Sequence, residues 1–395
     1  MPILPMGIPQ EVDKFFYNRE KDLKRLKNYI NALNLDVAEQ ILVTGFRGVG
    51  KTYLLKKLAL DLPDNILVAY VDISRLYGVQ KGIITEELIM KEILTALNQS
   101  LMRKESYPSK IRRSLTTALH MINWKKYDFR EAGGILGVDI PQVSDDYEKL
   151  SHFVMEFPQK LVESSSGKLN GVLLIIDEFQ LIGELQNPTA FFWMIRSYTQ
   201  QQDNVTYIFT GSTSQTSDIV EMINGTKGAY GGRMIQFNVA PFSYQETQSY
   251  LAEKVPEINF TDDGFSRFYQ CTRGIPAYIN SFCNTLSAGE IYDENKVKKT
   301  FFEKMDQITI MWIRIWGTLS QYEKEILINL AQFGPQKWTE LMENTALSRG
   351  TLSKYLDVLK NKGIITVEEK NYRIGDLMLD AWLEHRNNVD GYYPP

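Results

Sequence analysis

The segment GFRGVGKT, residues 45–52, has the residue types and spacing of a loop that wraps phosphate groups. Its fixed positions in the pattern G-x-x-x-x-G-K-[ST] are Gly45, Gly50, Lys51 and Thr52. Glycines let successive backbone N–H groups point inward at phosphate oxygens. Lys51 would bring a positive charge to the outer phosphates, and Thr52 would offer its hydroxyl to Mg²⁺. The other residues expected to contact the nucleotide here are Phe46, Arg47, Gly48, Val49 and Tyr53.

An acidic pair follows the apolar run in GVLLIIDEFQ, residues 171–180. Ligands of open α/β sheets bind at the carboxyl ends of the strands, which is where Asp177 and Glu178 would stand. Asp177 suits the outer shell of Mg²⁺, and Glu178 could polarise a water for attack on the terminal phosphate. The alternative is an Asp-Glu pair that only caps the next turn.

Three further side chains could complete a phosphate-cleaving site. In TGSTSQ, residues 210–215, Ser212 could reach the attacking water or the terminal phosphate, with Thr210 as second choice. The alternative is an ordinary turn after a strand. Arg233 and Arg273 could each bring a positive charge to the transferred phosphoryl group, from their own chain or from a neighbouring copy. Arginines of this kind are otherwise solvated surface charges.

The elements that must position these residues alternate in type. Apolar runs predict strands, and amphipathic stretches between them predict helices such as 19–33 and 53–62. This alternation predicts an α/β fold with a parallel sheet covered on both faces. Residues 73–170 are predicted to be a mostly helical insertion with a small hairpin in EAGGILGVDIPQVS. The predicted strands are 41–44, 66–72, 172–176, 205–210 and 234–239.

The pattern changes twice after this region. Beyond Pro241 it is helical to about Ile315, which predicts a separate helical segment. From Leu319, helices at 322–333 and 338–344 precede a third helix that Ser348 caps, and a two-stranded ribbon at 364–374 follows, the outline of a winged helix-turn-helix. The predicted domains are a phosphate-binding domain at 1–245, a helical domain at 246–315 and a winged helix at 316–395.

Composition limits the remaining classes. The 395 residues carry a net charge of −4, which gives no global attraction to nucleic acid or to an anionic membrane. Two cysteines and three scattered histidines argue against a zinc site or a disulfide framework. No apolar run is long enough to span a bilayer, and the N-terminus lacks the features of a secretion signal. We expect a soluble, cytoplasmic protein without a membrane partner.

The sequence resembles the archaeal ATPase family of P-loop proteins, which belongs to the STAND branch and is related to AAA+ proteins. The likeness rests on FYNREKDLKRL, ILVTGFRGVGKTYLL, LLIIDEFQ, FTGSTSQ, GGRMIQF and RGIPAYI, and a C-terminal winged helix fits it. The resemblance implies sheet order 5-1-4-3-2 and places Asn18 and Arg19 near the adenine and ribose. It implies that Pro276 begins the nucleotide-sensing lid segment and that Arg233 is the arginine before the last strand. The chain departs from the family pattern just before that arginine, where Ala229–Gly232 contains one extra glycine.

The resemblance and the absence of an Asn-Lys-x-Asp motif favour ATP and ADP over guanine nucleotides. The first hypothesis is a Mg²⁺-dependent ATPase that works as a molecular switch, with nucleotide-dependent assembly of identical copies as an option. The second is a nucleotide-regulated DNA-binding protein of replication, mobile-element or transcription type. A metabolic kinase lacks a visible second-substrate site. The winged helix could contact duplex DNA through Arg349, Lys354, Lys360 and Arg373, or it could dock on a protein, since acidic residues dilute its charge.

Overall fold

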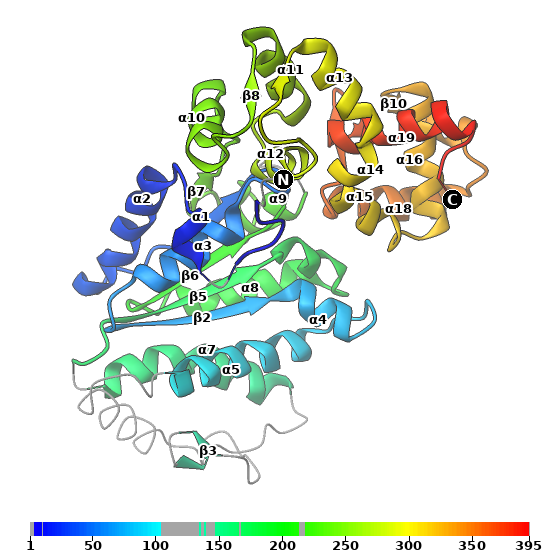
Figure 1. The fold of residues 1–395 in the computed structure, drawn as a ribbon. Coiled ribbons are helices and arrows are strands. Elements are labelled where there is room, and N and C mark those ends of the chain that lie inside the picture. The colour runs from blue at the N-terminus through cyan, green and yellow to red at the C-terminus, as the bar shows by residue number, and fades with distance from the viewer. Residues whose placement is uncertain are drawn as a thin grey trace.

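A five-stranded parallel sheet forms the centre of the fold (Figure 1). In the computed structural model its strand order is β2-β5-β6-β1-β7. When the five strands are numbered 1 to 5 along the chain, this order reads 2-3-4-1-5, which is the predicted order 5-1-4-3-2 read from the other edge of the sheet. The strands are β1 Ile41–Thr44, β2 Ile66–Asp72, β5 Gly171–Asp177, β6 Val205–Thr210 and β7 Ile235–Asn238. The structure describes residues 4–9, 11–103, 134–135, 138–139, 147–165, 167–212 and 218–394.

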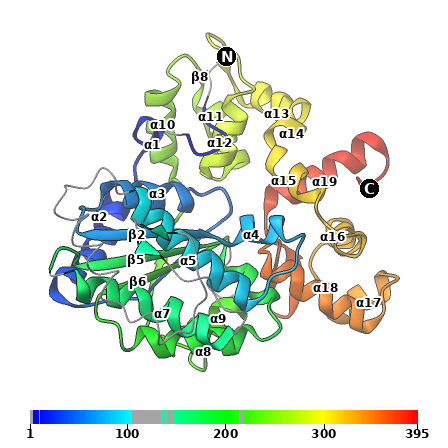
Figure 2. The ribbon, with the colours of Figure 1, turned by 90° about the horizontal axis from the view of Figure 1, so that it is seen from below.

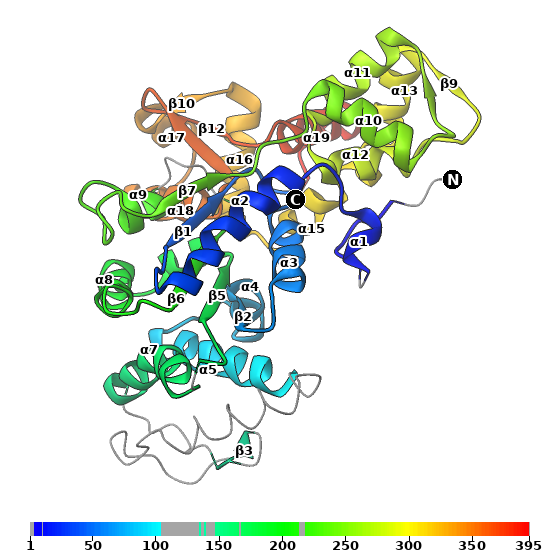
Figure 3. The same ribbon diagram turned by 90° about the vertical axis from the view of Figure 1, so that its left-hand side faces the viewer.

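Each face of the sheet has its own apolar core. On one face, α2 (Glu20–Asn31), the turn η1 (Ala32–Leu35) and α3 (Lys51–Asp61) pack on alternate strand residues such as Val43 and Ile175. The opposite side chains of the same strands contact the remaining helices, and Figure 3 shows α5 and α7 together below the strands. Burial on both faces explains why the strands are almost continuously apolar. The helices of this second face include α5 Glu86–Arg103, α7 Tyr147–Ser164, α8 Pro188–Thr199 and α9 Asp218–Asn224.

The described part of the predicted insertion is mostly helical. It contains α4 (Ile73–Val79) in addition to α5 and α7. Beyond the insertion, β5 is followed by the 3-10 helix η4 (Phe179–Glu184). The predicted hairpin is present as β3 (Gly134–Ile135) paired antiparallel with β4 (Val138–Asp139). The rest of the predicted helical stretch between 104 and 146 lies outside the described residues.

The segment after β7 forms the predicted helical lid, with one addition. Two short strands, β8 (Asn259–Phe260) and β9 (Ile291–Tyr292), pair in parallel within it. Two-residue strands have no periodicity, so the sequence did not reveal them. The lid helices are α10 Tyr244–Lys254, α11 Asp262–Thr272, α12 Pro276–Cys283, α13 Glu294–Glu303, α14 Met305–Ile308 and α15 Ile310–Trp316.

The C-terminal part is a winged helix, which Figure 2 shows to one side of the sheet. Its wing has three strands rather than the predicted two, because β10 adds to the edge of β12. Lid and winged helix share one continuous apolar cluster that includes Trp312 and Trp316. The elements are α16 Gln321–Phe333, β10 Gln336–Lys337, α17 Trp338–Asn344, α18 Arg349–Asn361, β11 Ile365–Glu368, β12 Asn371–Ile374 and α19 Leu377–Asp390.

Candidate active site

The glycine-rich loop joins β1 to α3 and is pressed between two other segments. A Cβ atom at Gly45 would lie 2.5 Å from the carbonyl oxygen of Val239, just beyond β7. At Gly48, whose φ is +78°, a Cβ atom would lie 2.6 Å from the Cβ of Ala277 in the lid. Helix α3 begins at Lys51, two residues earlier than predicted, with Gly50 as its N-cap. The helix N-terminus and its partial positive charge therefore face the loop.

Lys51 is buried, with 5% of its surface exposed. Its Nζ donates hydrogen bonds to the carbonyl oxygens of Gly45 (2.8 Å) and Phe46 (2.9 Å) and lies 3.4 Å from Oγ of Ser212. Burial lowers the pKa of Lys51 to about 8, and the nearby carboxylate of Glu178 opposes this shift. The geometry thus brings the predicted lysine and serine together at the end of β6.

Thr52 and Asp177 meet as the sequence predicts. Oγ1 of Thr52 donates to Oδ2 of Asp177 at 2.9 Å. Tyr70 on β2 donates to the same oxygen, and the backbone N–H of Glu178 donates to Oδ1 at 2.9 Å. Burial raises the pKa of Asp177, and the hydrogen bond from Tyr70 opposes that rise. Tyr70 was missed, although its place two residues before the end of a neighbouring strand was a usable signal.

This pair of oxygen donors fits Mg²⁺, which binds proteins through one or two carboxylates or hydroxyls and completes its shell with water and phosphates. Among the described residues there is no group of three or more His, Cys, Asp or Glu side chains that could hold a metal by themselves. A site on Thr52 and Asp177 would therefore depend on phosphate oxygens.

Glu178 lines the same cavity as Lys51, Thr52 and Ser212. Its backbone is left-handed, with φ +54°, and its carboxylate accepts a hydrogen bond from Nε2 of Gln180. Thr210, the second choice for the polar strand-end residue, is fully buried and is not among the described residues that line the cavity. The structure therefore favours Ser212 over Thr210.

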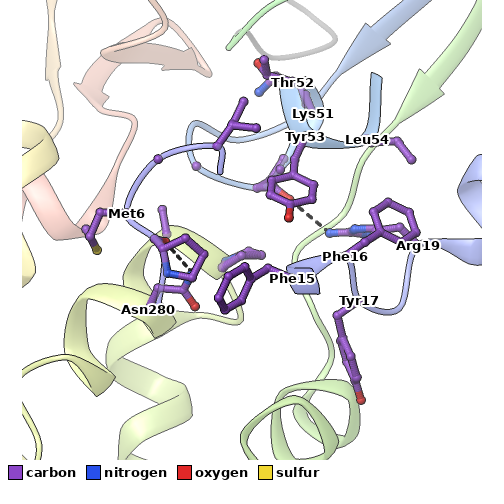
Figure 4. Close-up of a pocket in the computed structure, with 18 of the residues that line it drawn as sticks. Met6, Phe15, Phe16, Tyr17, Arg19, Lys51, Thr52, Tyr53, Leu54 and Asn280 are labelled. Carbon is purple, nitrogen blue, oxygen red and sulfur yellow. Dashed lines mark hydrogen bonds between the residues drawn. The ribbon is translucent and has the colours of Figure 1, made fainter. Parts of the chain in front are cut away.

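The cavity measures about 270 Å³ and is walled by apolar and aromatic groups on the side away from the loop. Figure 4 shows Met6, Phe15 and Asn280 on this side, with Thr52 opposite. In the N-terminal segment, Leu4 is buried in the lid cluster and Val12–Phe15 form the short helix α1. The apolar and aromatic lining residues include Met6, Ile8, Phe15, Phe16, Tyr17, Leu54, Phe242 and Tyr250.

Asparagine side chains of the lid hold this N-terminal segment in place. Asn284 bonds both the N–H and the carbonyl oxygen of Leu4, at 2.8 and 2.9 Å. Nδ2 of Asn280 donates to the carbonyl oxygen of Pro5 at 2.9 Å. The segment thus connects the lid to the cavity wall, a role that no sequence motif indicated.

Asn18 and Arg19, which the resemblance places near the adenine and ribose, lie in different surroundings in the structure. Arg19 lines the cavity, where its guanidinium donates to the carbonyl oxygens of Val49 (3.2 Å) and Ala240 (2.6 Å) and covers the ring of Phe242. Burial lowers the pKa of Arg19. Among the described residues that line the cavity, Asn18 is absent; its side chain bonds Glu246 instead.

The two predicted arginines lie outside the cavity of their own chain. Arg233 is exposed and directly precedes β7. The first residue of β7, Ile235, pairs in parallel with Ile41 at the start of β1. Arg233 therefore lies near the N-terminal ends of these strands, whereas the glycine-rich loop follows the C-terminal end of β1. The structure therefore does not bring Arg233 to the cavity of its own chain, and a role of Arg233 in catalysis stays a prediction. Arg273 is exposed and lines a second cleft between lid and winged helix, together with Phe46, which is 56% exposed. Pro276 does line the first cavity.

The positive side chains predicted to face DNA differ in their surroundings, because two are exposed and two lie beside carboxylates. Arg349 and Lys354 of α18 are exposed. Lys360 lies 3.5 Å from Asp357, and Arg373 is paired with Glu368. Helix α18 also contacts η4, the turn that follows Glu178. Part of the surface predicted for DNA therefore faces this chain's own ATPase domain.

A parallel sheet of this order, with a glycine-rich loop between β1 and α3, defines a P-loop ATPase-type domain, and the C-terminal elements define a winged helix-turn-helix. The family model described as an ATPase domain predominantly from Archaea matches residues 16–282, more than half of the chain, and the chain belongs to this family. The model for bacterial regulatory proteins of the arsR family matches residues 324–367. Both findings confirm the resemblance seen in the sequence.

Solved structures are also similar to this chain. A Walker-type ATPase of Pyrococcus abyssi is 17% identical, with TM-score 0.63 over 96% of this chain and 99% of that one. The Aeropyrum pernix Orc1 protein in complex with DNA is 13% identical, with TM-score 0.46 over 97% and 95%. The Thermotoga maritima Holliday junction branch migration motor RuvB is 14% identical, with TM-score 0.43 over 99% and 100%. No curated protein is significantly similar to this chain. Within the described part of the chain, no helix is long and apolar enough to cross a membrane.

Proposed function

We propose that this chain hydrolyses ATP with Mg²⁺ and uses the nucleotide state to control how the winged helix sits on the ATPase domain. The observation that carries this proposal is the contact between α18 and η4, because η4 begins directly after Glu178. A movement of the Glu178 carboxylate would thus be passed to α18 through the short helix η4.

The geometry supports the following roles. Lys51 holds the outer phosphates, and the hydroxyl of Thr52 with the carboxylate of Asp177 holds Mg²⁺, which when bound neutralises phosphate charge. Glu178 accepts the proton of the attacking water. Ser212, 3.4 Å from Nζ of Lys51, orients the terminal phosphate. The apolar and aromatic wall at the far end of the cavity suits a stacked adenine.

Electrostatics at the contact support the switch. Glu184 at the end of η4 is half-buried, and burial raises its pKa while Lys362 and Lys354 of the winged helix lower it. Lys362 is itself bonded to Glu323 at 2.6 Å. The docked face is therefore a small charge cluster whose members come from both domains, the kind of contact that a modest shift can break.

Turnover tests the enzymatic part. Glu178→Gln keeps size and hydrogen bonding but removes the base, so ATP should still bind with Mg²⁺ while turnover falls by roughly a hundredfold. The assay measures phosphate release with and without Mg²⁺, alongside nucleotide binding. Full turnover by the Gln variant would show that another group activates the water.

Amide hydrogen exchange tests the switch. Residues of α18 and η4 should exchange at different rates with ADP and with a non-hydrolysable ATP analogue. Glu184→Lys should place like charges together and raise exchange in α18 with either nucleotide, whereas Glu303→Lys on the exposed surface of α13 is the matched control. Identical exchange in all nucleotide states would overturn the switch.

The second candidate is a nucleotide-regulated DNA binder. The exposed Arg349 and Lys354 at the start of α18, the helix that reads DNA in helix-turn-helix proteins, favour it. If both contact phosphates, replacing them together by Ala should flatten the slope of log K against log salt by about two units. A chain that binds no duplex even at low salt would exclude this candidate. The domain limits at 245/246 and 315/316 are part of our proposal and can be tested by limited proteolysis.

A further inference from the structure

Gln180 is a buried amide in contact with the carboxylate of Glu178. It is the second residue of η4 and only 2% exposed. Its Nε2 donates a hydrogen bond to Oε2 of Glu178. The bond joins two side chains that follow the same strand, so its geometry is fixed by the short turn between them.

The space for this amide exists because residue 211 is glycine. A Cβ atom at Gly211 would lie 1.9 Å from Oε1 and 3.1 Å from Cδ of Gln180. Gly211 is itself bonded to β1, since its N–H donates to the carbonyl oxygen of Val43 at 3.4 Å. The amide therefore rests on the backbone between β6 and Ser212, on the rigid edge of the sheet.

Burial leaves one polar atom of the Gln180 amide unsatisfied. Among the described residues its Oε1, which is fully buried, has no hydrogen-bond partner. A buried polar atom without a partner costs about 1–3 kcal/mol, so an apolar side chain of similar length would suit the fold better. Glu178 carries a second cost, because its left-handed backbone (φ +54°) is unfavourable for a residue with a Cβ. Local strain of this kind is typical of functional sites.

We propose that Gln180 is a positioning residue for ATP hydrolysis. Its amide N–H holds the carboxylate of Glu178 in one orientation toward the cavity, so that the base meets the attacking water at a fixed angle. This inference rests on the proposed role of Glu178 as the base. A misplaced group of this kind costs a reaction up to about a hundredfold in rate.

The test compares Gln180→Met with Gln202→Met in the full-length chain. Gln202 is a matched control because it is also buried (6% exposed), donates from its amide to the carbonyl oxygen of Met155, and has an Oε1 without a partner among the described residues. Gln180→Met should lower kcat roughly ten- to hundredfold and leave KM for ATP within about twofold. Its melting temperature should stay the same or rise. Gln202→Met should leave kcat unchanged.

A double-mutant cycle separates positioning from general damage. In the Glu178→Gln background, Gln180→Met should cause no further loss, because the group that it positions is already gone. An equal loss in both backgrounds, or wild-type kcat in Gln180→Met, would overturn the inference. If Gln180→Met does not fold, Gln180→Asn takes its place in the test. This variant keeps the amide but shortens its reach, so its kcat should fall to the same extent. Full turnover by Glu178→Gln alone would instead refute the proposed base.

Discussion

ATP binding should weaken as the pH rises through about 8, because that is the pKa to which burial lowers Lys51. Below this pH the side chain is an ammonium, and above it the side chain is a neutral amine. Bound phosphates favour the ammonium and raise its pKa in the complex. Affinity is therefore constant at low pH and declines at high pH, the opposite of what a carboxylate with a lowered pKa would produce.

The magnitude follows from the two protonation states. If the pKa in the complex lies well above the range, the affinity between about pH 7 and about pH 9.5 should fall about thirtyfold, or about 2 kcal/mol. At about pH 8, where half of the free chains carry the neutral amine, binding should take up about half a proton. Phosphates have finished titrating by then, with a second pKa of about 6, so the ligand contributes little.

Calorimetric titration with a non-hydrolysable ATP analogue and Mg²⁺, in two buffers of different ionisation enthalpy, measures both quantities. Lys51→Met should bind roughly tenfold or more weakly at neutral pH and show no decline above it. Lys56→Met, an exposed lysine on the same helix, should keep the decline. A flat wild-type profile, or a decline that survives in Lys51→Met, would refute the argument.

Three other predictions concern the surroundings of the site. Tyr70→Phe removes a donor to the carboxylate of Asp177, and the Mg²⁺ concentration for half-maximal turnover should rise roughly tenfold; an unchanged Mg²⁺ titration would contradict this. Leu4→Ala opens a cavity in the lid cluster and should lower the free energy of unfolding in urea by about 2–3 kcal/mol, whereas an exposed N-terminal tail would show no change. If Arg233 acts on a neighbouring copy, mixing an Arg233→Ala chain with a Lys51→Ala chain should restore part of the ATP turnover; no recovery at any mixing ratio would speak against it.

The sequence predicted the parts of the fold that have strong local patterns. Strands 41–44, 66–72 and 205–210 were right to the residue because each is a mostly apolar run that follows a polar residue. The phosphate loop and the acidic pair were found for the same reason: their function needs particular residue types at short spacing. Ser348 also marked the start of α18 correctly, since an N-cap serine is a local signal.

Contacts between distant segments could not be predicted in this way. Nothing local to Leu4 indicates that Asn284, 280 residues away, will bind its backbone. Arg233 looked suitable by residue type and by its place before a strand. Only the register of β7 on β1 shows at which end of the strands Arg233 lies. Gln180 is similar, because its burial depends on the missing side chain of Gly211, which directly follows another strand, β6.

Lid and winged helix meet the ATPase domain at the phosphate loop as well as at η4. The N–H of Ala277 donates to the carbonyl oxygen of Gly48 at 3.2 Å, and the guanidinium of Arg47 lies 6.0 Å from the ring centre of Trp312. From Trp312, buried hydrogen bonds run to the hydroxyl of Tyr278 (2.5 Å) and on to Asp376 (2.6 Å), which caps α19.

Because lid and winged helix share one apolar cluster, we expect them to move together. Phosphates that attract Arg47 would then disturb this buried chain at one end while the carboxylate of Glu178 acts on η4 at the other. Two contacts on a single body are sensitive to small shifts at the nucleotide, since neither can adjust without moving the other.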